Sequence, residues 1–267
     1  MTSIKKNKIK SFLKSIYRVF TTLFFDLHLI LNKWRGLPYF FKTIHEYNKK
    51  NKNNTTFKLT YSALYPMLHE RFDDAGSAKG HYFFQDLWAS EYVQNHEINK
   101  IIDVGSRIDG YIAHLLPTTE VTYVDIRPIN KFHKNFISKQ GSILKMPFET
   151  NSVVNLSCLH VIEHIGLGRY GDKVNPQGYI EAIEELKRVC SSGGRMIIGV
   201  PVGNEQVYFN AHRVFDPQTI INLFSPFQLE EFSLIDDSGS GIIKNASIEE
   251  ASKCKYGCGL FIFINNA

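Results

Sequence analysis

Side chains suited to acid–base or anion-binding chemistry fall in four short blocks of this 267-residue sequence. Histidine titrates in the physiological range, so His164 or His212 is the candidate general base, with Glu163 orienting it. For each histidine the alternative is a hydrogen-bonded structural residue. Arginine forms paired hydrogen bonds to carboxylates and phosphates, so Arg169 and Arg213 are candidates to hold an acceptor substrate. The same blocks contain the other candidate substrate-binding residues, namely His81, Tyr82, Gln85, Tyr170 and Asn210.

Two of these groups allow other interpretations. Arg213 could brace its own loop through an ion pair to Asp216 instead of binding substrate. Residues 160–164 have the pattern H-x-x-E-H of inverted zinc peptidases, which requires both histidines on one helical face. Because His160 directly follows the apolar stretch 153–159, it should end a strand, and zinc hydrolysis is disfavoured.

Strands and helices alternate in the sequence after residue 80. Helices are expected at about 82–96, from the turn at 105 to about 116, at 178–190 (ended by a turn at 191–194) and at 217–224. Strands are expected at 100–104, 121–126, 136–138, 152–159, 195–200, 228–235 and 259–264. Strands separated by helices of this length require right-handed crossovers and a mostly parallel sheet. We therefore expect an α/β fold with a doubly wound, Rossmann-like, seven-stranded sheet whose last strand is antiparallel, plus a helical N-terminal extension.

The carboxyl ends of parallel strands are where such sheets bind ligands. The site should therefore be built from residues near 103–110, 125–127, 142–144, 158–172 and 200–213. Asp103 and Gly105 end the first strand, and a glycine there lets a ligand approach backbone N–H groups. Asp125 ends the second strand, where a carboxylate can accept hydrogen bonds from both hydroxyls of a ribose.

The order of these motifs resembles that of class I S-adenosylmethionine-dependent methyltransferases over about residues 98–265. The resemblance implies that Asp103 and Gly105 hold the methionine part of the cofactor, Asp125 the ribose, and Ser142 and Ile143 the adenine. Neighbouring residues complete the implied cofactor site, namely Ser106, Arg107, Ile126 and His160.

The chain departs from that family at two positions. The family's usual loop is G-x-G-x-G, whereas Arg107 stands at the second glycine of the present loop. Its guanidinium could pair with the carboxylate of the cofactor or could fill the pocket. Ser142 stands where an acid commonly accepts from the adenine amino group, and a hydroxyl is a weaker anchor.

A closer resemblance lies in four blocks, 80–87, 103–110, 157–172 and 209–215. These blocks resemble a bacterial methyltransferase-like family known only as a domain of unknown function. They are long and specific, but they imply no particular reaction.

The predicted activity is transfer of the methyl group of S-adenosylmethionine to a small polar acceptor. A sugar or sugar-phosphate hydroxyl of surface-polysaccharide biosynthesis is the first choice, because the expected site is polar and contains arginine. One alternative is a non-catalytic scaffold or accessory subunit, for which the departures at Arg107 and Ser142 argue. Another is a nucleotide-sugar or NAD enzyme, which also uses an acid after the second strand.

The composition excludes several classes of protein. With 18 Gly, 9 Pro and 4 Cys, the chain is neither collagen-like nor of low complexity nor a disulfide scaffold. Only Cys254 and Cys258 form a close pair, which most simply marks a turn at Gly257, so no metal is expected.

The N-terminal arm is strongly basic. Residues 1–60 carry a net charge of +11 and the other 207 residues carry −6, which makes +5 in total. The body is therefore not expected to bind nucleic acid, and only the arm could meet an anionic surface. We place the domain boundary at the polar linker 49–56, so that residues 1–56 form the extension and 57–267 the α/β domain.

A stripe of apolar residues at helical spacing marks a helix over 11–34, and Gly36 and Pro38 predict a stop and a second helix at 38–49. Charged residues interrupt every run of about 20 residues, which argues against a membrane span, and no small-residue cleavage site follows, which argues against a secretory signal. The stripe could pack on the body or a second subunit, or lie on an anionic inner leaflet. The expected location is cytoplasmic, peripheral on the inner membrane in the second case. The stripe consists of Leu13, Tyr17, Phe20, Phe24, Leu27, Leu31 and Trp34.

Overall fold

The computed structural model describes residues 27–52, 57–60, 62, 64–72, 78–127 and 129–266. The chain divides into two compact units, Met1–Ser77 and Ala78–Ala267. This division falls later than the boundary expected at residue 56. The reason is that the segment around Leu68 and Arg71 packs on the helix of the first unit, where the Arg71 guanidinium lies 3.8 Å from the ring centroid of Tyr39.

The first unit contains one long helix, α2 (Leu27–Lys50), and a short 3-10 turn, Glu70–Phe72. The prediction that Gly36 ends a helix is wrong, because α2 continues through both Gly36 and Pro38. Gly36 instead permits close packing, since a Cβ there would lie 1.8 Å from the carbonyl oxygen of Leu68. The part of the predicted stripe before Leu27 lies outside the described residues, whereas Leu31 and Trp34 are exposed. No helix in the described part of the chain has the length and apolarity needed to cross a bilayer.

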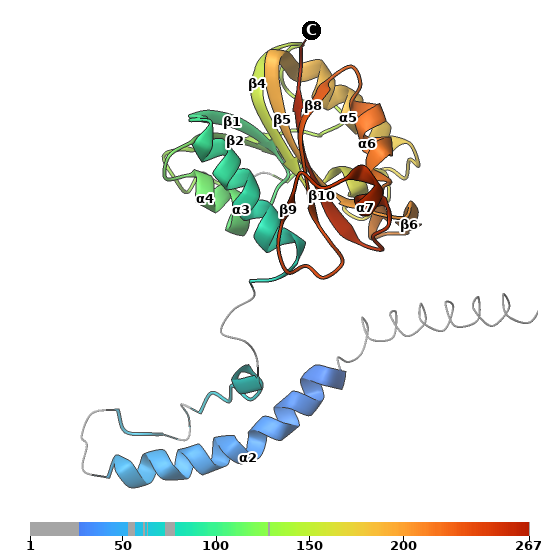
Figure 1. Cartoon of the computed structure of the whole chain (residues 1–267). Helices are drawn as coiled ribbons and strands as arrows, with labels where there is room; N and C mark the ends of the chain where they lie inside the picture. The colour runs from blue at the N-terminus through green and yellow to red at the C-terminus, as the bar shows by residue number, and fades with distance from the viewer. Residues whose placement is uncertain are drawn as a thin grey trace, which may run out of the picture. The chain divides into compact units, whose positions relative to one another are not determined.

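The second unit is built on one sheet with the strand order β3-β2-β1-β4-β5-β10-β8-β9 (Figure 1). The prediction of seven strands is corrected to eight by β9, a two-residue edge strand that pairs with β8. The strands are β1 (Lys100–Val104), β2 (Glu120–Asp125), β3 (Phe136–Gln140), β4 (Val153–Leu159), β5 (Cys190–Val202), β8 (Gln228–Ile235), β9 (Ile243–Lys244) and β10 (Gly257–Ile264). A separate hairpin joins β6 (Gln206–Tyr208) and β7 (His212–Val214).

The direction of the strands confirms the predicted doubly wound sheet. Strand β1 is parallel to both β2 and β4, and β4 is parallel to β5. The last strand, β10, runs antiparallel between β5 and β8. From β1 the chain first builds outward through β2 and β3 and then returns to β4 on the other side. The strand order therefore reverses between β1 and β4, which is where a sheet of this kind binds its ligands.

Helices cover both faces of the sheet, and two apolar cores result (Figure 1). One face packs against α3, where Trp88 and Val93 meet sheet residues such as Ile262. The other face packs against α5 and α6, which contribute Ile183 and Phe224. The described helices of this unit are α3 (Gly80–Asn95), α4 (Ala113–Leu115, which follows a π-helical turn), α5 (Gly178–Val189), α6 (Pro217–Phe224) and α7 (Ile248–Ser252).

The segment 191–194 differs from its prediction as a turn. Strand β5 begins at Cys190, directly after α5, and the segment belongs to it. The ladder between β4 and β5 shifts register here, since Val153 pairs with Cys190 but Asn155 pairs with Arg195. The extra residues form a bulge, which glycines accommodate well.

Candidate functional site

Two adjoining cavities lie at the carboxyl ends of β1, β2 and β4. Their volumes are about 130 Å³ and about 260 Å³. Each is smaller than the ~300 Å³ at which small-molecule pockets begin, but they share five lining residues and so form one cleft. The shared residues are Gly105, Arg127, His160, His164 and Tyr170. The cleft lies at the predicted switch point, although the expected segment 200–213 lines neither cavity.

The turn after β1 is built on the carboxylate of Asp103. That carboxylate is fully buried and accepts hydrogen bonds from the backbone N–H of Ser106 at 3.0 Å and from its hydroxyl at 2.6 Å. The Ser157 hydroxyl donates to the same group at 2.7 Å. Burial raises the pKa of Asp103 to about 6, against the lowering effect of these bonds. Asp103 lines neither cavity. It stabilises the turn after β1 through these hydrogen bonds, which corrects the expectation that it contacts a cofactor directly.

Gly105 occupies the position that the turn requires of a glycine. Its φ of +68° lies in the left-handed region, and a Cβ there would approach Val161 Cγ2 to 3.2 Å. The residue lines both cavities. The absence of a side chain therefore leaves the backbone of the turn open to a ligand.

Asp125 ends β2 and lines the first cavity, as predicted for a ribose-binding acid. Both of its oxygens are engaged by Arg127, whose Nε lies 3.0 Å from Oδ1 and whose Nη2 lies 3.1 Å from Oδ2. The Tyr123 hydroxyl donates to Oδ2 at 3.3 Å. Burial acts to raise the pKa of Asp125, but hydrogen bonds and charge from Arg127 outweigh burial and lower it. The carboxylate is thus ionised and already paired.

Arg107, which stands at the second glycine of the usual loop, does not enter the first cavity. Its guanidinium pairs with Asp109 through bonds of 3.0 and 2.8 Å and lies 4.8 Å from the ring centroid of Tyr82. It lines only the second cavity. The Arg107 side chain therefore does not fill the first cavity, and the guanidinium that covers the Asp125 carboxylate is that of Arg127.

The remaining expected cofactor residues surround the same cleft. Ile126, Ser142 and Ile143 line the first cavity, and Ser106 lines the second. The Ser142 hydroxyl accepts from the backbone N–H of Leu144 at 3.2 Å, which fixes the loop after β3. All the sequence-predicted cofactor residues except Asp103 are therefore brought together here.

His164 is the predicted base that the structure places in the cleft. Its Nδ1 lies 2.6 Å from the backbone carbonyl of Ala211, so Nδ1 carries the proton and Nε2 is the basic nitrogen. Burial lowers the pKa of His164, assisted by the charge on the nearby Arg169. A neutral imidazole with a fixed tautomer can accept a proton from an alcohol.

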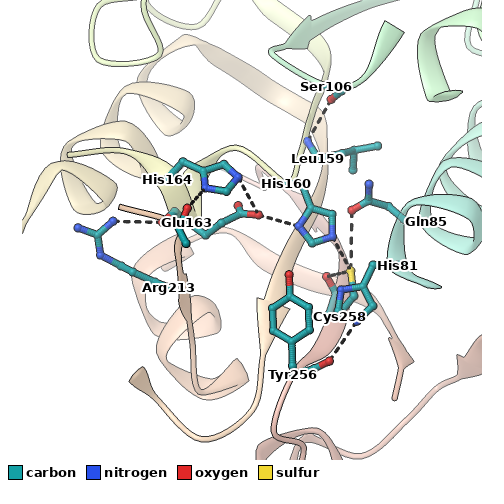
Figure 2. A network of polar contacts seen from close by, with 12 residues as sticks. His81, Gln85, Ser106, Leu159, His160, Glu163, His164, Arg213, Tyr256 and Cys258 are labelled. Atoms are coloured by element: carbon teal, nitrogen blue, oxygen red, sulfur yellow. Dashed lines mark hydrogen bonds and ion pairs between the residues drawn. The ribbon is translucent and has the colours of Figure 1, made fainter. Parts of the chain in front are cut away.

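Glu163 was expected to orient His164 or His212, and the structure corrects this. Its Oε1 lies 2.6 Å from His160 Nδ1 but 3.8 Å from His164 Nε2 (Figure 2). The Glu163 side chain is buried, and although burial acts to raise its pKa, His160 lowers it. Glu163 therefore orients His160, whereas a backbone carbonyl orients His164.

The pattern H-x-x-E-H does not form a zinc-peptidase helix. His160 follows β4 with a φ of +55°, and only the 3-10 turn Ile162–His164 comes after it. The two histidines do not share the face of an α-helix. The expectation that His160 ends a strand is confirmed.

Arg213 lines neither cavity, and its guanidinium bonds backbone carbonyls and not the carboxylate of Asp216, which was one expected partner. Its guanidinium donates to the backbone carbonyls of Glu163, Ile165 and Pro176 at 3.3, 2.7 and 3.2 Å. These bonds tie the loop after β4 to the hairpin. Asp216 instead caps α6 by accepting from the backbone N–H of Gln218 at 2.8 Å.

The other expected substrate and catalytic residues are divided between the cleft and its surroundings. Tyr82 lines the second cavity and Tyr170 lines both. Arg169 and His212 lie nearby without lining either cavity: the first donates to the Ala211 carbonyl at 3.1 Å, and the second packs on Tyr256 at 4.9 Å between ring centroids. Three further predicted residues, His81, Gln85 and Asn210, also line neither cavity.

Sequence reasoning missed the contribution of three residues. Arg127 and Tyr123 bracket Asp125 at two positions after and before it, a spacing that could have indicated contact across one face of a strand end. Asp172 organises the glycine loop, since it accepts from the backbone N–H groups of Gly166 and Gly168 at 2.8 and 3.3 Å. Asp172 also lines the first cavity.

The fold is similar to solved methyltransferases of low sequence identity. A proposed sarcosine dimethylglycine methyltransferase from Galdieria sulphuraria has 15% identity and a TM-score of 0.50, over 67% of this chain and 84% of that one. The N-methyltransferase NodS from Bradyrhizobium japonicum, solved with S-adenosylhomocysteine, has 14% identity and a TM-score of 0.47, over 68% and 85%. The first of these likenesses confirms the predicted class I methyltransferase fold.

The comparison of sequences adds the family. No curated protein matches this chain. The model of a family described as Caenorhabditis protein of unknown function, DUF268, matches residues 122–255, which is half of the chain. This match confirms the resemblance to a family known only as a domain of unknown function. The chain therefore belongs to the DUF268 family.

Proposed function

We propose that this protein is a methyltransferase that uses S-adenosylmethionine and methylates a small polar acceptor. The observation that carries the proposal is the shared cleft, in which the glycine turn at Gly105, the carboxylate of Asp125 and the basic nitrogen of His164 meet. The class I fold supports it, since such folds bind their ligand at this edge of the sheet.

The residues present fit the cofactor in their chemistry. A carboxylate on the second strand can accept from two ribose hydroxyls, and a glycine with φ of +68° leaves its turn open to a ligand. Apolar side chains of Ile126 and Ile143 line the first cavity and suit an adenine ring. The fit requires that the hydroxyls replace Arg127 on Asp125, because its guanidinium now bonds both oxygens.

In this proposal Asp125 and Ile126 hold the ribose, Ser142 and Ile143 the adenine, and the turn at Gly105 the amino-acid part. The sulfonium of the cofactor supplies an electrophilic methyl group. His164 accepts the proton of the acceptor hydroxyl at Nε2, and Tyr170 confines the acceptor from the loop side. Alignment of the reacting atoms provides the rest of the catalysis.

For the acceptor we propose a sugar or sugar-phosphate hydroxyl. The support is the polar character of the second cavity, where Arg107, Asp109 and Tyr82 lie beside His164. Mass spectrometry of full-length protein incubated with the cofactor and a panel of nucleotide sugars and sugar phosphates would reveal a methylated product. Methylation of amine acceptors alone would overturn this choice of acceptor and leave the methyltransferase proposal standing.

Calorimetric titration with S-adenosylmethionine and S-adenosylhomocysteine tests the cofactor. We expect micromolar affinity that Asp125→Ala abolishes, whereas Glu120→Ala, at the opposite end of the same strand, retains it. Absence of heat at millimolar ligand would favour a non-catalytic scaffold. Thermal stabilisation by NAD or nucleotide sugars alone would favour a nucleotide-sugar or NAD enzyme.

A further inference from the structure

Three residues that are distant in sequence bring metal-binding atoms together beside the cleft. His81 lies in the first turn of α3, His160 follows β4 and Cys258 lies near the start of β10. One ligand atom from each lies within 4.8 Å of the other two. Cys258 and His160 are buried, and His81 is partly buried. Figure 2 shows both imidazole rings next to the Cys258 sulfur.

The distance between two of these ligand atoms matches the spacing that a shared zinc ion imposes on a nitrogen and a sulfur ligand. His160 Nε2 lies 3.6 Å from Cys258 Sγ. Zinc binds nitrogen at about 2.0–2.1 Å and sulfur at about 2.3 Å, so tetrahedral angles separate such a nitrogen and sulfur by about 3.5 Å. The two ligand atoms thus already stand at the spacing that zinc requires.

Each histidine is oriented through its other ring nitrogen. His160 Nδ1 lies 2.6 Å from Glu163 Oε1, and His81 Nε2 lies 3.1 Å from the carbonyl oxygen of Tyr256. Both partners accept, so these nitrogens carry protons and the opposite nitrogens are the ones that can ligate. A carboxylate or carbonyl behind a histidine is the usual support of a metal ligand.

We propose that His81, His160 and Cys258 bind one zinc ion. Imidazole with thiolate is a donor set for zinc and not for magnesium or calcium, which take oxygen ligands. Binding forms the Zn–S bond with loss of the thiol proton to solvent, so affinity falls as the pH falls. Three protein ligands leave one position of four for an exchangeable ligand.

The zinc site shares only His160 with the expected cofactor site and uses none of the residues assigned to the ribose or the adenine. It borders the cleft through His160, which lines both cavities. It also revises the expectation that the chain holds no metal. That expectation considered Cys258 with Cys254, whereas the partners of Cys258 come from residues 81 and 160.

Elemental analysis of the full-length protein, purified after growth with zinc, tests the proposal. We expect one zinc per chain, and loss of it in both Cys258→Ser and His81→Ala. Cys254→Ser is the matched control, since Cys254 is also a buried free thiol and should keep the metal. Glu163→Gln keeps all three ligands and should weaken zinc affinity by about 10–100-fold.

Cobalt(II) substitution gives a second readout that does not depend on activity. The protein should show a thiolate-to-cobalt charge-transfer band that Cys258→Ser lacks and Cys254→Ser retains. Circular dichroism shows whether each variant is folded, and His81→Ala serves if Cys258→Ser is not. Metal-free folded protein, or zinc retained by folded Cys258→Ser or His81→Ala, would overturn the proposal. Because zinc content is measured without cofactor, failure here is distinct from failure of the methyltransferase proposal.

Discussion

The guanidinium of Arg127 covers the carboxylate of Asp125, with bonds of 3.0 Å to Oδ1 and 3.1 Å to Oδ2. The same guanidinium lies 5.2 Å from the ring centroid of Tyr170, which lines both cavities. Arg127 thus stands between the two parts of the cleft. A ribose that binds Asp125 through two hydroxyls has to replace these bonds.

Replacing Arg127 should therefore strengthen cofactor binding. The side chain of Arg127 is 67% exposed whereas that of Asp125 is 8% exposed, so this ion pair should contribute about 1 kcal/mol, the upper end of the range for exposed pairs. Arg127→Ala removes this competitor and should lower the dissociation constant of S-adenosylhomocysteine by at most about fivefold. Calorimetric titration measures the change. Lys253→Ala, which removes an exposed cation paired with Glu249 outside both cavities, is the control and should leave the dissociation constant unchanged.

Weaker binding in Arg127→Ala would show that the arginine holds the ligand and does not compete with it. The proposed displacement would then be wrong, while the role of Asp125 would still be tested by Asp125→Ala.

The pH dependence of methyl transfer should report His164. Burial and the charge of Arg169 hold the pKa of His164 below 6.5, and the neutral form is the one that accepts a proton. Turnover should therefore rise with pH through a pKa below 6.5 and stay level above it. His164→Ala should reduce turnover by about 10²–10⁴-fold. Rate measurements across pH 5–8 check both expectations.

Arg169→Ala sharpens this test, because removal of a nearby positive charge raises the pKa of His164 and moves the rise to higher pH. Lys253→Ala, which removes an exposed cation paired with Glu249, is the control. A profile that does not move in Arg169→Ala would exclude His164 as the group that titrates.

Elements with strong local signals could be predicted from the sequence. Helix α6 has its predicted bounds because Asp216 caps it and Pro217 occupies its first turn. Elements that depend on distant partners could not. Glycine commonly ends a helix, but Gly36 lies inside α2, where the absence of a side chain leaves room for the carbonyl of Leu68. Likewise, pairing with β4 turns the glycines at 193 and 194 into a bulged strand.

The residues of the site show the same difference between local sequence signals and contacts with distant partners. Asp125 could be placed from the sequence, because a residue that ends a parallel strand must lie at the ligand edge of the sheet. The spacing of Arg127, two residues after Asp125, indicates that the two side chains can meet, but the rotamer that lets the guanidinium bond both carboxylate oxygens cannot be predicted from the sequence. The inward direction of Asp103 depends on Ser157, which comes from the adjacent strand β4. The approach of Cys258 to His160 needs the antiparallel β10 beside β5, which only the assembled sheet shows.

The buried Asp103 should make the protein less stable as the pH rises, whereas most carboxylates make a protein more stable. Its pKa in the folded protein is about 6, above 3.8 for the exposed group. Its stabilising contribution is therefore complete below about pH 4 and is lost as the pH rises through 6. Asp103→Asn removes this dependence, so the variant should gain at most about 3 kcal/mol relative to the wild type between pH 4 and pH 7.

Urea unfolding at several pH values measures this difference in the free energy of unfolding. Only its change with pH is informative, since Asn also loses hydrogen bonds to Ser106 and Ser157 at every pH. Asp236→Asn is the control, because Asp236 is only partly buried and hydrogen bonds from Ser238 lower its pKa. A constant difference between Asp103→Asn and wild type would contradict the raised pKa.

Gly199 should be intolerant of a side chain because of the buried amide of Gln85. A Cβ at Gly199 would lie 2.2 Å from Gln85 Oε1, whereas a Cβ at Gly241 would meet nothing within 4 Å. Overpacking of this kind costs about 1–3 kcal/mol. Gly199→Ala should therefore lower the free energy of unfolding by that amount in urea, and Gly241→Ala should leave it within about 0.5 kcal/mol of wild type. Equal stability of the two variants would show that Gln85 can move aside.

The basic N-terminal arm allows a test of the interpretation that the apolar stripe lies on an anionic membrane surface. Five lysines, Lys5, Lys6, Lys8, Lys10 and Lys14, precede or begin the predicted apolar stripe. Each lysine close to an anionic surface contributes about 1 kcal/mol, and salt screens the attraction within about 10 Å. Full-length protein should therefore float with vesicles that contain anionic lipid, and added salt should reduce the recovery.

The matched control replaces the same five lysines with glutamine, which keeps these side chains polar and removes their charge. If the stripe lies on the membrane, this variant should lose flotation, while its unfolding temperature should stay that of the wild type. The alternative, in which the stripe packs on protein, predicts equal and low recovery with neutral and anionic vesicles. In that case Leu31 and Trp34, which are exposed on α2, would be the positions to test for contact with a second copy of the chain.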